Sequence, residues 1–140
     1  MNNSNTKKSY KSLLIVLLVA FITAGGVFMF SMLGKSQEER RNREYEVSLV
    51  NALKNSYQGI EEIKISNPEY TNPPGDWSCK IDILFKDGEK IFYGIPHNLD
   101  EKENYNGRMT YGQRDFLNLR KGTTTNTVTV TYSNKERGEQ

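Results

Sequence analysis

The chain has 140 residues, of which 36% are hydrophobic and 26% are charged, and its formal net charge is +2. This length leaves room for one ordinary domain. Residues 1–34 carry three lysines and no acidic side chain, so the remaining 106 residues hold 16 basic and 17 acidic side chains. A domain that binds nucleic acid through phosphates has clustered basic charge. The nearly neutral balance therefore predicts no nucleic-acid partner.

An apolar segment, LLIVLLVAFITAGGVFMFSML, occupies residues 13–33 and contains 21 residues without a charge. A helix of this length is about 31 Å long, which is enough to cross a bilayer. The alternative is a signal peptide cleaved near Ala24, with Lys7, Lys8 and Lys11 as its basic region. Because the apolar run continues past the small residues, we expect a retained transmembrane helix in contact with the lipid bilayer.

The orientation of this helix follows from what flanks it. Residues 1–12 are short and basic, whereas more than 100 residues follow the span, as in a signal anchor with its N-terminus inside. We expect a single-pass protein of the cell membrane with a cytoplasmic tail over residues 1–12 and an extracytoplasmic C-terminal domain. The single cysteine excludes a disulfide within the chain. A domain of this size buries an adequate core without one.

A charged stalk over residues 34–44 is expected to lead into a helix that runs from Gln37 to Gly59. Its apolar face repeats every four residues, and glycine commonly closes such a helix. The face consists of Tyr45, Leu49, Leu53 and Tyr57. The arginines of the stalk, Arg40, Arg41 and Arg43, are alternatively a contact for lipid headgroups.

Alternating apolar and polar residues predict strands after this helix. The first strand, residues 60–66, places Ile63 and Ile65 on one side. The last, residues 125–133, places Val128, Val130 and Tyr132 inward.

A hairpin is predicted between these two strands, from WSCKIDILF and EKIFYGI. A two-residue turn would put the apolar residues of the second strand on the wrong side of the sheet. A three-residue loop, 86–88, with Gly88 in the left-handed conformation, pairs Ile83 with Ile91 and Cys79 with Ile95.

The connections are less regular. Residues 67–76 contain Pro68, Pro73 and Pro74 and are expected to form a turn-rich loop. Residues 96–113 have no period and are long for a plain connection. The sequence QRDFLNLRKG predicts a short helix that buries Phe116, Leu117 and Leu119. The polar residues 134–140 are expected to be a disordered tail.

These elements predict an α+β domain over residues 45–133. A helix packs on a roughly four-stranded antiparallel sheet, a second short helix accompanies it, and the transmembrane helix precedes both.

Groups for catalysis are few. His97 is the only histidine. Cys79 belongs to the apolar side of a predicted strand, where a thiol packs as a small hydrophobic group. A Cys79–His97 pair is the alternative, but His97 is expected to begin an exposed loop. The acidic residues Asp100, Glu101 and Glu103 are alternatively a cation site, although their spacing matches no calcium loop. We predict a protein that is not an enzyme, with no catalytic, cofactor or metal site.

The two long loops carry the side chains that most resemble a protein-binding surface, because tyrosine and arginine dominate such contacts. The candidate partner-binding residues are Tyr70, Tyr105, Arg108 and Tyr111. The last strand, if it lies at a sheet edge, is an alternative site for an extended peptide.

The lysine-led anchor, the charged stalk and the segments YQGIEEIKI, PPGDWSCKIDILFKDG and VTVTYSN resemble the small single-pass membrane-anchored proteins of low-GC Gram-positive bacteria. The resemblance implies an immunity factor, an inhibitor or an accessory subunit of an envelope complex, and it carries over no functional residue. We therefore expect a non-catalytic extracytoplasmic module that binds another protein. The alternative is an anchored sensor of a small ligand or cation that uses loop 96–113.

Overall fold

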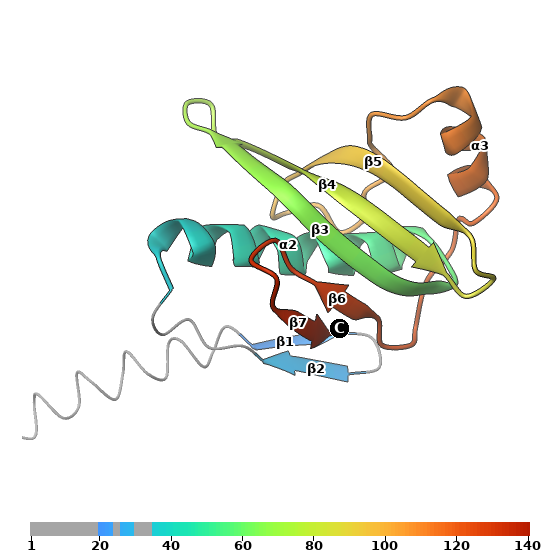
Figure 1. The fold of residues 1–140 in the computed structure, drawn as a ribbon, viewed down its shortest axis with the longest axis horizontal. Helices are drawn as coiled ribbons and strands as arrows, with labels where there is room; N and C mark the ends of the chain where they lie inside the picture. Colours follow the sequence, from blue (N-terminus) through green and yellow to red (C-terminus); the bar gives the residue numbers. More distant parts are fainter. Residues whose placement is uncertain (1–19, 24–25, 30–34) are drawn as a thin grey trace, which may run out of the picture.

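The computed structural model describes residues 20–23, 26–29 and 35–140. Over these residues two helices accompany a five-stranded sheet, and a separate two-stranded hairpin precedes them (Figure 1). The expected α+β class is confirmed. The helices are α2 (Gln37–Ser56) and α3 (Tyr111–Asn118). The strands of the sheet are β3 (Ile60–Thr71), β4 (Asp76–Phe85), β5 (Lys90–His97), β6 (Thr129–Thr131) and β7 (Arg137–Glu139).

The predicted tail over residues 1–12 and most of the predicted transmembrane helix over residues 13–33 lie outside the described residues. The described parts of the apolar segment are β1 (Ala20–Thr23) and β2 (Gly26–Met29), which pair antiparallel. This hairpin lies beside β7 (Figure 1). None of the helices that the structure describes is both long and apolar enough to span a membrane.

Helix α2 starts at Gln37 as predicted and ends at Ser56, three residues before the predicted end at Gly59. The Oγ of Ser36 accepts a hydrogen bond from the Glu39 N–H at 3.1 Å and so caps the first turn. At the other end the Tyr57 N–H donates to the Leu53 carbonyl. Gly59, with φ +75°, then turns the chain into β3.

Residues 34–44, predicted to be a charged stalk and the start of the helix, belong largely to α2, and the last of them pack on the domain. The Trp77 indole N–H donates to the Asn42 Oδ1 at 3.1 Å. The Arg43 guanidinium lies 4.0 Å from the centroid of the Tyr132 ring, and Asn42 and Arg43 are both buried. The domain therefore begins at the start of α2, and Arg43 is not at the surface, where a lipid headgroup would need it.

The sheet has the strand order β5-β4-β3-β6-β7. Three of its four pairings are antiparallel, whereas β6 lies parallel to β3 through the pair Ile63 and Val130. The predicted four-stranded antiparallel sheet is therefore corrected to a five-stranded mixed sheet. The chain leaves β5, passes through α3 and returns to the far side of the β3-β4-β5 meander, where the edge of β3 is open. There its apolar residues Val128, Val130 and Tyr132 face inward, as predicted, and are buried.

The hairpin register is confirmed. Ile83 pairs with Ile91, Ile81 with Tyr93 and Cys79 with Ile95. The Phe85 N–H donates to the Glu89 carbonyl at 2.9 Å, which leaves residues 86–88 as the loop. Gly88 has φ +88°.

The predicted loop over residues 67–76 is shorter than expected. Pairing of β3 with β4 continues through Tyr70 and Trp77 to Thr71 and Asp76. A register shift between Ser66 and Glu69 accommodates Pro68, which has no N–H to donate. Only residues 72–75 turn the chain.

One face of the sheet forms the core, and α2 covers it (Figure 1). The opposite face carries polar residues that alternate with the buried ones along each strand, such as Lys64, Lys80 and Asp82. The buried core residues from the strands are Ile60, Ile63, Ile65, Trp77, Cys79, Ile81, Ile83, Phe85, Ile91, Tyr93, Ile95 and Val130.

Residues 134–140 are not the disordered tail that their polarity predicts. The segment turns back as β7, and its last residue, Gln140, is fully buried against α2. The Gln140 Nε2 donates to the Val47 carbonyl at 3.1 Å, and its Oε1 accepts from the Tyr132 hydroxyl at 2.6 Å. The buried Gln140 side chain packs here because its amide finds hydrogen-bonding partners.

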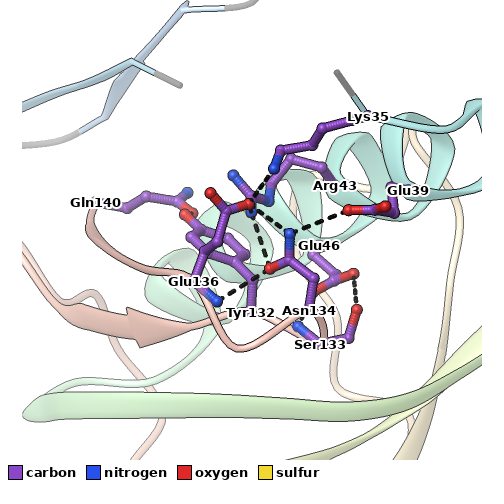
Figure 2. Close-up of polar contacts among 9 residues, drawn as sticks. All are labelled: Lys35, Glu39, Arg43, Glu46, Tyr132, Ser133, Asn134, Glu136 and Gln140. Carbon is purple, nitrogen blue, oxygen red and sulfur yellow. Dashed lines mark hydrogen bonds and ion pairs between the residues drawn. The ribbon is translucent and has the colours of Figure 1, made fainter. Parts of the chain in front are cut away.

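The turn between β6 and β7 is bound to α2 by charged groups (Figure 2). The buried Glu46 carboxylate accepts hydrogen bonds from the N–H and the hydroxyl of Ser133, both at 2.7 Å. Burial nevertheless raises the pKa of Glu46. Glu136 binds Lys35 at 2.5 Å and Arg43 at 2.8 Å. The hydrogen bond from Lys35 is the main cause that lowers the pKa of Glu136 to about 2.

Candidate functional site

The four predicted partner-binding residues lie in three places. The Arg41 guanidinium lies 4.4 Å from the Tyr70 ring, near the start of α2. Tyr105 packs edge-on against Tyr57 at 5.7 Å, beyond the end of the same helix. Residues near Arg41 and near Tyr57 are about 24 Å apart along a helix axis. Arg108 forms a backbone bridge with Gly94 of β5, and Tyr111 begins α3 three residues later, so these two are the pair that lies nearest together.

The long connection 98–110 covers the outer edge of β5. Three carbonyl groups of that edge accept hydrogen bonds at 2.8 Å. The carbonyl of Phe92 accepts from Gln113 Nε2, that of Gly94 from the Arg108 N–H, and that of Pro96 from Asn104 Nδ2. An open edge invites pairing with another chain, so these bonds remove β5 as a place for strand addition.

The alternative peptide site on the last predicted strand requires a free sheet edge, and this strand, β6, has none. β6 pairs with β3 on one side and with β7 on the other. It is an interior strand, so its backbone groups are already used in the sheet.

Helix α3 lies beside β5 (Figure 1) and contacts the β4–β5 hairpin. A capping box between Thr110 and Gln113 fixes its start. Leu117 is 1% exposed, and the Phe116 ring meets the Phe85 ring at 5.7 Å. At its end the Arg120 guanidinium stacks on Phe116 at 3.6 Å and binds Asp87 at 2.8 Å.

This arrangement leaves large apolar side chains in solvent. Tyr111 is 92% exposed, Leu119 is 82% exposed and Phe92 is 54% exposed. The prediction that Leu119 is buried is wrong, because the helix ends at Asn118 and the next residue points away. Phe92 was overlooked, although its place between the inward Ile91 and Tyr93 already assigns it to the outer face. We call Phe92, Arg108, Tyr111 and Leu119 the β5–α3 surface.

A groove of about 550 Å³ continues this surface over the face of the sheet opposite α2. Gly94 forms part of its floor, and the side chains of Lys80, Arg108 and Glu69 line it. The segment 108–122, which includes α3, carries four basic side chains and one acidic one. A charge count over the whole domain conceals this local excess.

His97 is buried, not at the start of an exposed loop as predicted; it is 1% exposed and ends β5. Its Nε2 lies 2.8 Å from the Ser48 Oγ, and its Nδ1 lies 3.2 Å from the Asn104 Nδ2. The Asn104 amide is fixed, because its Nδ2 also donates to the Pro96 carbonyl and its Oδ1 accepts from the Asn106 N–H. Nδ1 of His97 is therefore an acceptor, and the proton is on Nε2.

This tautomer decides the chemistry of the pair. A base that activates serine must accept the hydroxyl proton through an unprotonated nitrogen. Here the His97 Nε2–H donates to Ser48, and burial lowers the pKa of His97 to about 4. The cluster joins α2, β5 and the loop after β5, and it is not arranged as a nucleophile with its base.

The remaining reactive groups are also isolated. Cys79 is 4% exposed, and burial raises the pKa of its thiol. The Glu101 carboxylate accepts from the Asn98 N–H at 3.0 Å. Over residues 35–140 no three side chains of histidine, cysteine, aspartate or glutamate converge on a point where a metal ion would bind.

Comparisons of the chain with protein-family models, with curated proteins and with solved structures give no match. The functional argument therefore depends on the geometry of the β5–α3 surface.

Proposed function

We infer that this chain is a membrane-anchored, non-catalytic module whose extracytoplasmic domain binds another protein through the β5–α3 surface. The observation that carries the proposal is the exposure of Tyr111, Leu119 and Phe92, which lie at the two ends of α3 and on the neighbouring strand β5. Exposed apolar side chains that form one patch mark interaction sites, whereas single ones do not, and we propose that these three act together. Tyrosine and arginine, as at Tyr111 and Arg108, are the residue types enriched where binding energy concentrates.

The rigidity of this surface favours binding. The hydrogen bond from Gln113 to Phe92 and the ion pair of Arg120 with Asp87 hold α3 at both ends. A partner does not have to order the helix, so less of the binding free energy is lost to conformational entropy.

The membrane anchor rests on the uncharged segment 13–33. A two-stranded hairpin such as β1–β2 leaves unpaired backbone groups along both outer edges, which lipid cannot hydrogen-bond. A helix satisfies all of these groups within the segment. In a bilayer we therefore propose that residues 13–33 form a single transmembrane helix.

A pull-down from cross-linked membranes tests the binding function. The full chain is expected to recover a stoichiometric protein partner, and the double variant Tyr111→Ala, Leu119→Ser is expected to lose it. Leu99→Ser is the matched control, since Leu99 is 44% exposed but lies beside Ser48 on another surface. Recovery of no partner by the unmodified chain would contradict the proposal.

The anchor has its own test. The full chain is expected to stay with membranes after alkaline carbonate washing, and protease added to intact cells with a permeable wall should digest the domain. Release of a product that begins near Val27 would instead identify a cleaved signal peptide.

The alternative of a cation sensor stays a prediction. A rise in the melting temperature of the chain on addition of calcium would support it.

A further inference from the structure

Two cationic side chains flank a glycine across three adjacent backbone segments. Lys80 pairs directly with Gly94 in the β4–β5 ladder, and Gly94 forms a bridge with Arg108 on its other side. Residues directly opposite one another in a sheet point to the same face. Lys80 and Arg108 therefore rise from one face, about 10 Å apart, with no side chain between them.

The gap between them is the groove of about 550 Å³. A Cβ atom added to Gly94 would have only the Cys79 carbonyl oxygen, at 3.8 Å, within 4 Å, so the floor of the groove is open to an incoming group. Asn67, Ser78 and Asn106 supply further polar side chains around it.

Neither cation is neutralised by the domain. Within residues 35–140 neither Lys80 nor Arg108 forms an ion pair, and both are exposed. Glu69 is the one acidic residue that lines the groove. The charge is also local: segment 108–122 has four basic residues against one acidic residue, whereas the remainder of residues 35–140 has an acidic excess.

We propose that the groove binds an acidic segment of the partner protein, with carboxylates between Lys80 and Arg108 and an apolar residue against Phe92. The inference rests on the proposed function and adds the chemistry of the partner. Arginine presents a planar fork that suits a carboxylate, and lysine supplies a point charge. Phe92 is two residues from Gly94 on the same side of β5, so the apolar and anionic contacts adjoin.

A protein segment is the occupant that the charges of the groove favour, because a carboxylate can bind between two cations that form no ion pair within residues 35–140. The groove lies toward the start of α2, since Glu69 and Ser78 line it and the neighbouring Trp77 donates to Asn42. A contact with lipid headgroups is therefore a separate outcome that the test distinguishes.

The test places the photo-cross-linking residue p-benzoylphenylalanine at position 92 of the full chain, in its native membranes. We expect an adduct with a protein. The charge reversal Lys80→Glu, Arg108→Glu should lower the adduct yield about tenfold or more, and raised salt should lower it in the unreversed chain. Lys86→Glu, Lys102→Glu changes the net charge equally at exposed sites outside the groove and should leave the yield unchanged.

Each outcome has a distinct meaning. Equal adduct yields from the charge-reversed variant and from the unreversed chain would overturn the proposal that an acidic segment binds in the groove, and would leave the proposed function intact. Equal losses from both reversals would also overturn it, because the effect would be one of overall charge. An adduct with lipid alone, or no adduct while the pull-down still recovers a partner, would move the contact away from the groove. If the reversal lowers the melting temperature, Lys80→Gln, Arg108→Gln replaces it and should lower the yield in the same direction.

Discussion

Ser48 and His97 are joined by a 2.8 Å hydrogen bond in which the imidazole, not the hydroxyl, is the donor. The direction follows from Asn104, whose amide fixes the unprotonated nitrogen of the ring. A neutral, buried histidine of this kind links protein stability to pH.

Protonation of His97 should destabilise the domain. Burial lowers its pKa in the folded protein to about 4, whereas an unfolded histidine titrates near 6.5. The unfolded state therefore binds the proton first, and the contribution of His97 to stability is full above pH ~6.5 and declines as the pH falls toward 4. The expected loss is about 2–3 kcal/mol in the free energy of unfolding. Urea unfolding between pH 7.5 and 4.5 measures it.

The variant His97→Gln isolates this contribution, because carboxyl groups such as Glu46 titrate in part of the same range. The difference in unfolding free energy between the chain and the variant should depend on pH. A constant difference would mean that His97 does not carry the effect.

Gly107 should not tolerate a side chain. A Cβ atom there would lie 2.6 Å from the Cδ2 of Tyr93, a ring that is itself buried. We expect Gly107→Ala to lower the free energy of unfolding by about 1–3 kcal/mol. Gly112→Ala is the matched control. Its nearest neighbour is the Thr110 Oγ1 at 3.9 Å, and alanine in a helix gains about 0.5–1 kcal/mol over glycine. Equal midpoints for the two variants in chemical denaturation would refute the packing at Gly107.

Gln140 should matter more than its terminal position suggests. Gln140→Ala removes the acceptor of the Tyr132 hydroxyl and the donors to Val47 and Asn51. Loss of buried hydrogen bonds of this kind costs about 2–3 kcal/mol. Glu139→Ala, at an exposed neighbour, should change the melting temperature little. An unchanged melting temperature for Gln140→Ala would show that the last residue is not packed.

Cys79 should react only when the domain opens. Its thiol is 4% exposed, and its pKa is raised by burial. We expect labelling by a thiol reagent to be more than about a hundredfold slower in buffer than in denaturant. Rapid labelling of the native protein would contradict its place in the β4 core.

Local patterns predicted the fold where one face of an element is buried. The alternation of Ile81, Ile83 and Phe85 against Ile91 and Tyr93 was enough to choose a three-residue turn over a two-residue one, because a register shifted by one residue would expose one of the two rows. The four-residue repeat of α2 and the glycine after it were likewise sufficient.

Long-range pairing was not predictable in the same way. Nothing local in Val128 or Val130 specifies a parallel partner rather than an antiparallel one, since alternation is the same in both. The segment 133–140 packs because it forms hydrogen bonds with Arg43, Glu46 and Asn51 of α2. No local pattern near residue 140 predicts these distant partners. The prediction that His97 is exposed was wrong for the same reason, because its partners, Ser48 and Asn104, come from elsewhere in the chain.

Of the four candidate partner-binding residues, Tyr70 and Tyr105 pack on their own domain, and Arg108 and Tyr111 stay a prediction. Tyrosine alone does not distinguish these outcomes, because it serves both in cores and at interfaces.

The parallel pairing of β3 with β6 affects the order in which the domain folds. The β3-β4-β5 meander consists of near neighbours and can assemble early, but β3 then has one uncovered side until Val130 arrives beside Ile63. Contacts between segments far apart in the sequence form late and slow folding, and the unpaired edge of β3 is prone to aggregation until they form. The docking of β6 onto β3 is therefore expected to be the late step that completes the sheet.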